Sequence, residues 1–316
     1  MVIFLLILCV FGGLLVAVTP VDLAWTRWLM EHRHEGFTHV MRRTLFEGHL
    51  PGASDLPVLL ILGMTVAYVL AQRPTASRRL AAWRPALGYL ITGALAAGLG
   101  VVHSLKWVMG RPRPWSVFGR GELPYTEWYQ FGAHYITDGI YRGSFPSGHA
   151  AAAFMFMALA YALAGDRRAP LGQRLAGVAV GLFALLLAGA MLVANAMSRS
   201  HWLSDGVAVI GLVWLTLHAL YFWVLRVPEQ QRLAPAWGIP GKPLDGRAYW
   251  ELRWCGWGAL LLIGLVLLAL ALRGLWFAAP WWVPALLVGL GAGLVVWSFP
   301  RFTVEYSQFQ RRLRSP

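Results

Sequence analysis

Charged residues and cysteines are both scarce in this chain of 316 residues. Only 13% of the residues are Asp, Glu, Lys or Arg, whereas 58% are hydrophobic, and the mean hydropathy is +0.57. This composition excludes an ordinary soluble domain and indicates an integral membrane protein. The two cysteines, Cys9 and Cys255, lie in apolar segments, so we expect them to pack and not to form a disulfide or a metal framework.

Acidic residues are scarcer than basic ones. The chain has 14 Asp and Glu against 27 Lys and Arg, which gives a formal charge of +13. Excess positive charge can serve nucleic-acid binding, but here the basic residues lie between apolar segments. We therefore expect an anionic lipid bilayer as the partner and no nucleic acid. The sequence indicates no particular protein partner, and its Arg- and Ala-rich composition favours a bacterial source.

Eight apolar segments are each close to the ~20 residues that a helix needs to cross the hydrocarbon core. They predict an all-α, polytopic transmembrane bundle. The expected spans are about 2–18, 56–71, 85–108, 147–165, 176–195, 201–225, 255–272 and 281–297. The first segment could be mistaken for a signal peptide. It lacks a basic leading segment and a clear small-x-small cleavage site, so we interpret it as a span.

The loops predict an orientation. With the N-terminus in the cytoplasm, the short basic segments also lie inside, as the positive-inside rule expects. These segments are 73–84, 166–174, 226–253 and 301–316. Polar clusters at the ends of the third, fourth and sixth spans then share the outer face. We expect the three clusters, at 106–113, 146–149 and 198–205, to converge there.

The first cluster places two cations, Lys106 and Arg113, at the outer end of the third span. Such charges can simply snorkel to the interface. Arg, however, suits bidentate phosphate contacts, and Lys suits point-charge contacts. Pro112 and Pro114 stiffen the turn around Arg113. We interpret Arg111 as the interface charge of this group.

The second cluster, Pro146-Ser147-Gly148-His149, opens directly into the fourth span. Pro146 is tolerated in a first helical turn, Ser147 can cap the helix, and Gly148 allows close approach to the backbone. A helix start of this kind suits a phosphate. An ordinary capped helix that happens to contain a His would show the same pattern.

The third cluster contains His201 and Asp205, which share one helix face at i and i+4. The carboxylate can hold one imidazole nitrogen and leave the other available for attack. A helix-start His with a capping Asp is the structural alternative. An ionisable residue near a membrane span nevertheless favours a functional role.

Together these residues resemble the type 2 phosphatidic acid phosphatase superfamily. Its pattern is Lys-x6-Arg-Pro, then Pro-Ser-Gly-His, then Ser-Arg-x5-His-x3-Asp. The first two motifs are intact here, but Asn195 stands six residues before His201, where the family has Arg. The resemblance covers about residues 54–225. It implies a six-helix membrane core that needs no metal or other cofactor.

The resemblance also implies a role for each matched residue. His201 would attack phosphorus and form a phosphohistidine, Asp205 would orient it, and His149 would protonate the leaving lipid oxygen. The phosphoryl oxygens would be held by Lys106, Arg113, Ser147 and the backbone N–H of Gly148.

The Asn at position 195 leaves one phosphate-binding cation unaccounted for. If the fifth span stays helical to its end, Arg199 lies one turn beyond Asn195 on the same face and could replace that cation. Arg142 is a second candidate. A weakened enzyme, or one of altered specificity, is the other interpretation.

The predicted protein is thus a lipid-phosphate phosphatase of the bacterial inner membrane, with its site facing the periplasm. Alternatives are a lipid-to-lipid phosphotransferase and a non-catalytic lipid-binding or transport protein. We divide the chain into a first span with an amphipathic periplasmic connector (1–53), a phosphatase core (54–225), a cytoplasmic linker (226–254), and two C-terminal spans with a basic tail (255–316). The connector histidines lack the partner spacing of a metal site. They are His32, His34, His39 and His49.

Overall fold

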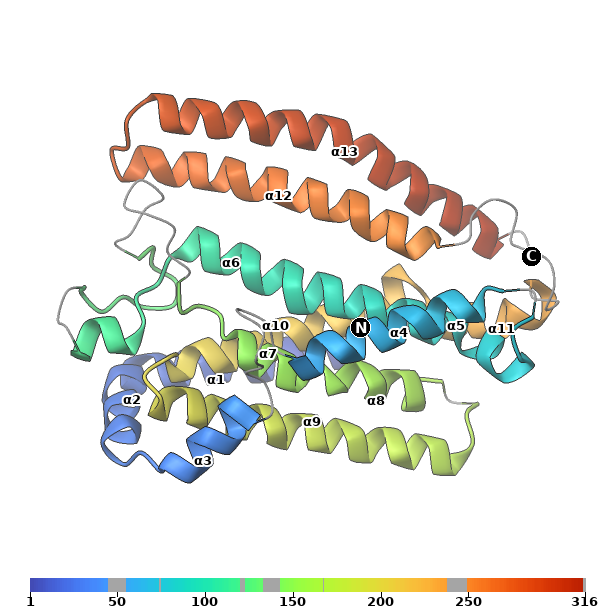
Figure 1. Cartoon of the computed structure of the whole chain (residues 1–316), viewed down its shortest axis with the longest axis horizontal. Helices are drawn as coiled ribbons and strands as arrows, with labels where there is room; N and C mark the ends of the chain where they lie inside the picture. The colour runs from blue at the N-terminus through green and yellow to red at the C-terminus, as the bar shows by residue number, and fades with distance from the viewer. Residues whose placement is uncertain are drawn as a thin grey trace.

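The computed structural model describes residues 1–44, 55–73, 75–119, 123–132, 143–166, 168–237 and 249–314. These residues are mainly helical and include no strand (Figure 1). The helices are α1 (Val2–Val18), α2 (Asp22–Glu31), α3 (Glu35–His39), α4 (Asp55–Ala71), α5 (Arg78–Gly93), α6 (Val102–Met109), α7 (Gly148–Phe154), α8 (Phe156–Ala164), α9 (Leu171–Met197), α10 (Leu203–Ala219), α11 (Val227–Trp237), α12 (Trp250–Trp276) and α13 (Trp282–Arg314). A π-helical segment, Ala94–Val101, joins α5 to α6, and another, Leu220–Val224, extends α10. The predicted all-α bundle is confirmed.

Six of the described helices are long and apolar enough to cross a membrane, which makes this a multi-pass membrane protein. They are Val2–Glu31, Arg78–Met109, Leu171–Met197, Leu203–Leu233, Trp250–Trp276 and Trp282–Arg314. Two shorter apolar helices, Pro57–Ala71 and Gly148–Ala164, occupy the second and fourth expected spans. All eight expected segments are therefore helical.

The two C-terminal helices extend beyond their apolar segments. α12 begins at Trp250, before the expected start at 255, and α13 continues through the expected tail to Arg314. Trp250 stacks on Phe309 with ring centroids 4.0 Å apart, so the two helices support each other past the apolar region. Part of the expected linker is also helical, because α11 packs against α5.

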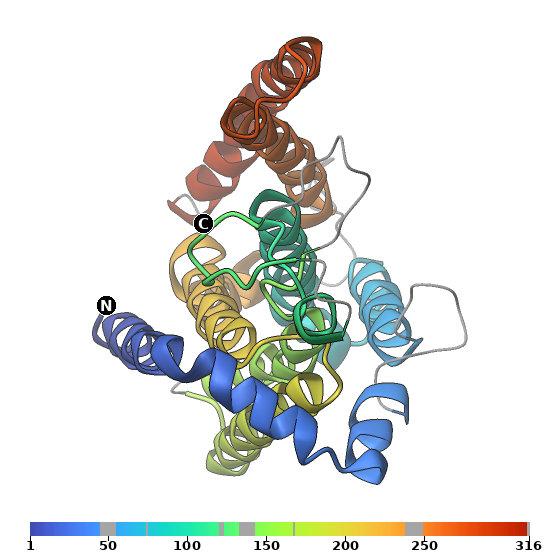
Figure 2. The same ribbon diagram turned by 90° about the vertical axis from the view of Figure 1, so that its left-hand side faces the viewer.

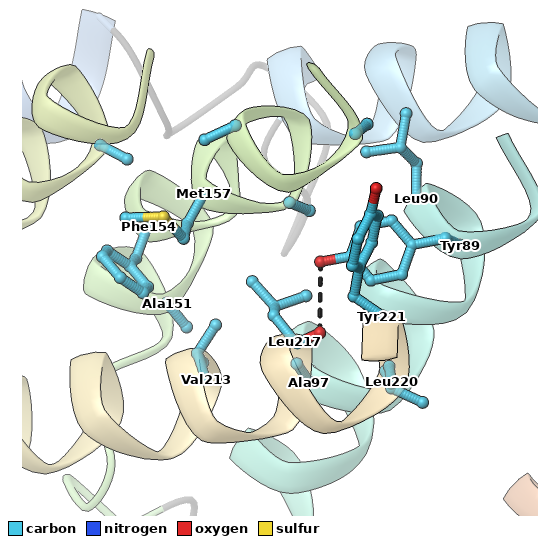
Figure 3. Close-up of a cluster of buried hydrophobic side chains, with 14 of the residues drawn as sticks. Tyr89, Leu90, Ala97, Ala151, Phe154, Met157, Val213, Leu217, Leu220 and Tyr221 are labelled. Carbon is cyan, nitrogen blue, oxygen red and sulfur yellow. Dashed lines mark hydrogen bonds between the residues drawn. The ribbon is translucent and has the colours of Figure 1, made fainter. Parts of the chain in front are cut away.

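α6, α7, α8 and α10 lie in the middle of the bundle, and α9 lies along one side of it (Figures 1 and 2). The α12–α13 hairpin lies on the other side, against α5 and α6. α8 and α9 approach closely because Gly177 faces Ala164; a Cβ on the glycine would lie 2.6 Å from the Ala164 Cβ. Tyr89 of α5 donates to the Leu217 carbonyl of α10 at 3.3 Å (Figure 3). These contacts hold the helices together away from the polar clusters, which lie at the other helix ends.

Those helix ends meet at one end of the bundle, on the left in Figure 1, where α6 and α9 end and α7 and α10 begin. We call this the site end and the other the opposite end. α2 also lies at the site end, with Asp22, Thr26 and Leu29 buried and with Trp25 and Trp28 exposed. The connector therefore has the amphipathic pattern that the sequence predicts.

Candidate active site

Gly110 ends α6 and turns the chain into the first polar cluster. Its φ of +57° lies in the left-handed region, which favours glycine at a helix C-terminus. One turn earlier, the buried side chain of Lys106 donates from Nζ to the carbonyls of Gly143 and Ser144, at 3.2 Å each. Lys106 therefore points into the protein and does not snorkel to a membrane interface.

Ser147 caps α7, as the sequence predicts. Its side-chain oxygen accepts from the backbone N–H of Ala150 at 3.4 Å. Pro146 does not lie in the first helical turn as expected. The helix begins only at Gly148, so Pro146 precedes the capping residue. The peptide bond between Phe145 and Pro146 is cis. His149 follows as the second residue of α7 and is partly exposed.

His201 lies in the turn between α9 and α10, close to the residue expected to orient it. Its Nδ1 is 2.7 Å from the Ser144 carbonyl oxygen and 3.5 Å from Oδ2 of Asp205. Because a carbonyl only accepts, Nδ1 carries the proton and the Nε2 lone pair is available for attack. Asp205 is near, as predicted, but the short hydrogen bond goes to a partner that the sequence did not indicate.

The surroundings of His201 keep its imidazole neutral. Burial, together with the positive charges of Lys106 and Arg113, lowers the pKa of His201 to about 3, against the opposing effect of Asp205. A neutral imidazole at neutral pH is what a nitrogen nucleophile requires. The influence of both cations on this pKa also means that the first and third clusters have come together.

Ser144 joins the clusters through its backbone. Its N–H donates to the Arg111 carbonyl at 2.8 Å, and its carbonyl accepts from both Lys106 and His201. Its hydroxyl donates to the Pro112 carbonyl at 3.2 Å. Most of these contacts use main-chain atoms, which any residue type supplies. No side-chain pattern could therefore have singled out this position.

Arg111 is not the interface charge that we expected. Its guanidinium is fully buried and donates to Asp205 Oδ1 at 2.7 Å and to Asp22 Oδ2 at 3.0 Å. The turn at Gly110 directs the side chain inward, between carboxylates from α2 and α10. Asp22 is 89 residues away in the sequence, so no spacing rule could reveal this pair.

A family model described as the PAP2 superfamily matches residues 85–229. The match covers less than half of the chain, and we call residues 85–229 the PAP2 segment. It runs from α5 to the start of α11 and contains all three polar clusters. Members of this superfamily are phosphatases, which supports a phosphatase-type function for the segment. Comparisons with curated proteins and with solved structures gave no match.

Two polar residues of the PAP2 segment bear on the missing cation. Asn195 is buried and donates from Nδ2 to the Ser147 hydroxyl at 3.1 Å, which ties the end of α9 to the cap of α7. Arg199 is exposed, with a φ of 61°, in the turn beyond α9. Because α9 ends at Met197, Asn195 and Arg199 do not share a continuous helix. A phosphate-binding role for Arg199 stays a prediction, and Arg142 lies outside the described residues.

Two of the connector histidines have local contacts. The His34 side chain accepts from the Phe37 N–H at 3.0 Å and caps α3, and His32 stacks on Trp28 with centroids 4.4 Å apart. Among the described residues, no group of three His, Cys, Asp or Glu side chains is placed to hold a metal ion. His49 lies outside the described residues.

Proposed function

We propose that this protein is a membrane lipid-phosphate phosphatase that works through a phosphohistidine at His201. The orientation of His201 carries the proposal: its Nδ1–H points to the Ser144 carbonyl at 2.7 Å, so that Nε2 keeps its lone pair. Lys106 and Arg113 lie close enough to depress the pKa of this imidazole. A neutral nucleophile beside two cations suits attack on an anionic phosphoryl group.

In the first step, Nε2 of His201 forms a bond to phosphorus and the bond from phosphorus to the lipid oxygen breaks. His149, in its protonated form, gives its proton to the leaving oxygen. The phosphorylated imidazole keeps the Nδ1 proton and becomes a cation. The Asp205 carboxylate, 3.5 Å from Nδ1, stabilises this charge.

In the second step, water attacks phosphorus and the bond from phosphorus to nitrogen breaks. His149, now neutral, takes a proton from the water, and His201 returns to its neutral form. Inorganic phosphate leaves. The same side chain thus acts as acid and then as base, as microscopic reversibility requires.

The phosphoryl oxygens need groups that offset their charge in both steps. In this proposal they are held by Lys106, Arg113, Ser147, the backbone N–H of Gly148, and Arg199. Ser147 is supported from both sides, because its hydroxyl contacts Ala150 and Asn195.

The substrate in this proposal is a phosphomonoester or pyrophosphate of a membrane lipid, taken from the periplasmic leaflet of a bacterial inner membrane. The basic segments 73–84 and 166–174 support this orientation, because they connect helices at the opposite end of the bundle. Basic segments of this kind favour the cytoplasmic side. A reporter fused after Gly165 is expected to read as cytoplasmic, and one inserted near Gly121 as periplasmic. The reverse result would contradict both the orientation and the substrate pool.

The test of function is phosphate release by the purified protein in detergent. The lipid panel comprises an isoprenyl pyrophosphate, phosphatidic acid, phosphatidylglycerophosphate and a lipid A phosphate. We expect release that persists in EDTA and that disappears in His201→Ala. Activity abolished by EDTA and restored by a divalent ion would contradict the mechanism. Transfer of phosphate to a second lipid, without release, would indicate a phosphotransferase.

A further inference from the structure

A buried carboxylate from outside the PAP2 segment reaches the start of α10. Asp22 of α2 is fully buried, and its Oδ1 accepts from the backbone N–H of Ser204 at 3.1 Å. Its Oδ2 accepts from the Ser204 hydroxyl at 2.5 Å and from Arg111 Nη2 at 3.0 Å. Asp22 therefore caps the helix that carries Asp205 and also holds the arginine beside it.

Arg111 is fixed in one orientation by its hydrogen bonds. Nη1 donates to Ser204 Oγ and to Asp205 Oδ1, each at 2.7 Å. The remaining donors contact Asp22, the Tyr125 hydroxyl at 3.3 Å and the Thr126 carbonyl at 2.9 Å. These five contacts equal the five N–H groups of a guanidinium. Burial opposes the positive charge, but Asp205 and Asp22 outweigh it and raise the pKa of Arg111, so the cation persists.

Arg111 in turn sets the orientation of Asp205. Oδ1 of Asp205 is held by Arg111, and Oδ2 accepts from the backbone N–H of Trp202 at 2.9 Å. Oδ2 is also the oxygen that lies 3.5 Å from Nδ1 of His201. A continuous series of buried polar contacts thus runs from Asp22 through Arg111 and Asp205 to His201.

The charges in this series matter as well as the geometry. Asp205 alone with Arg111 would form a neutral pair and would offer little to a cationic imidazole. Arg111 and two hydrogen bonds from Ser204 favour the ionised form of Asp22 against its burial. With Asp22 ionised, two carboxylates share one guanidinium, and the group carries a net charge of −1. In a buried setting such a charge acts strongly on its neighbours.

We propose that Asp22 and Arg111 are positioning residues for catalysis: they hold the Asp205 carboxylate toward His201 and preserve its negative charge. The N-terminal helices thus complete a site whose other residues belong to the PAP2 segment. This inference rests on the proposed phosphohistidine mechanism. Both side chains act through Asp205 and have no role in holding the phosphoryl group.

The test is Asp22→Asn in the full chain, purified in detergent. A single-turnover experiment with a radiolabelled substrate from the lipid panel gives two quantities: the amplitude of phosphoenzyme formation and its rate constant. We expect the amplitude to stay near that of the wild type and the rate constant to fall about 10–100-fold, the loss that is typical when the outer partner of a metal-ligating histidine is removed. Asp22→Glu, which keeps the charge, should recover part of the loss.

Glu251→Gln is the matched control. Glu251 is a buried carboxylate that accepts from Arg84 at 3.3 Å, at the opposite end of the bundle. The rate constant of phosphoenzyme formation in Glu251→Gln is expected to equal that of the wild type. Ser204→Ala is a second, milder test, because it removes the hydroxyl between Asp22 and Arg111 while leaving every charge in place. We expect a several-fold lower rate constant with full amplitude.

The outcomes separate the two levels of the argument. Wild-type protein that forms no phosphoenzyme would overturn the proposed mechanism and this inference with it. Suppose instead that the wild type forms phosphoenzyme normally and that Asp22→Asn shows a lower amplitude with an unchanged rate constant. This result would overturn the inference alone, and Asp22 would be a purely structural residue. If Asp22→Asn fails to fold, an unchanged rate constant in Ser204→Ala has the same consequence.

Discussion

Within the described residues, an arginine–carboxylate cluster lies at each end of the bundle, and the two clusters are built alike. At the site end, Arg111 lies between Asp22 and Asp205. At the opposite end, Glu251 of α12 accepts from Arg84 of α5 and from the Tyr68 hydroxyl of α4. Each cluster joins helices that are far apart in the sequence.

What differs is the neighbour of each cluster. Asp205 lies next to a histidine, whereas the partners of Glu251 belong to helices that it simply packs against. Arg84 and Lys106 lie on one helical run, which separates them by about 33 Å. A buried ion pair is by itself weak evidence of function. In the proposed mechanism, the histidine beside the site-end pair is what distinguishes it from the pair at the opposite end, which contacts only groups of the helices packed around it.

Among changes to the two clusters, Asp205→Asn is expected to have the largest effect. An amide cannot stabilise the cationic phosphoimidazole as a carboxylate does, so we expect turnover to fall about 10²–10⁴-fold. Steady-state phosphate release measures this loss, with size-exclusion chromatography to show that the variant is intact. A near-normal rate would mean that the two clusters do not differ in function.

Arg199→Ala tests how many cations the site end uses. If Arg199 replaces the charge absent at Asn195, its loss should lower turnover about 10²–10³-fold, as for other charge-stabilising contacts in a water-poor site. Adding Asn195→Arg to this variant should then restore much of the rate. An unaffected Arg199→Ala enzyme would leave Arg142 as the candidate. If loss of Arg199 and loss of Arg142 both leave turnover unchanged, the site uses two cations.

The arrangement of these cations follows from features visible in the sequence. Each apolar segment has nearly the length of one membrane crossing, and successive crossings bring alternate helix ends together. The order and length of the apolar segments are therefore enough to assign Lys106, His149 and His201 to one end of the bundle.

Contacts between distant segments could not be found in this way. Asp22 looks like one polar residue of an amphipathic connector, and no periodicity links it to Arg111. The carbonyl of Ser144 leaves no trace in the sequence, because every residue has one. The extension of α12 to Trp250 depends on stacking against Phe309, which only the folded hairpin brings together.

Glu251→Gln should affect stability and not catalysis. Removing one partner of a buried ion pair costs about 3–5 kcal/mol, because the remaining charge stays buried without compensation. We therefore expect a clearly lower thermal midpoint, with kcat and KM within about twofold of the wild type for the intact fraction. A selective loss of kcat would show that the opposite-end cluster also serves the reaction.

The smallest expected effect concerns the response of the site end to pH. The folded-state pKa of His201, about 3, lies below the ordinary value of about 6.5 that applies in the unfolded chain. Between these values the unfolded state binds more protons. The contribution of His201 to stability is therefore fully present above pH 6.5 and is lost as the pH falls toward 3.

In His201→Gln this pH-dependent loss of stability is absent. Thermal midpoints from pH 7 to pH 4 should therefore fall more steeply for the wild type, by up to about 1.4 kcal/mol of unfolding free energy per pH unit. Groups that do not contact His201 are shared by both proteins and contribute alike to the two curves, so the difference reports on His201 together with its neighbour Asp205. Parallel curves would mean that His201 is not held neutral by burial and by the two cations beside it.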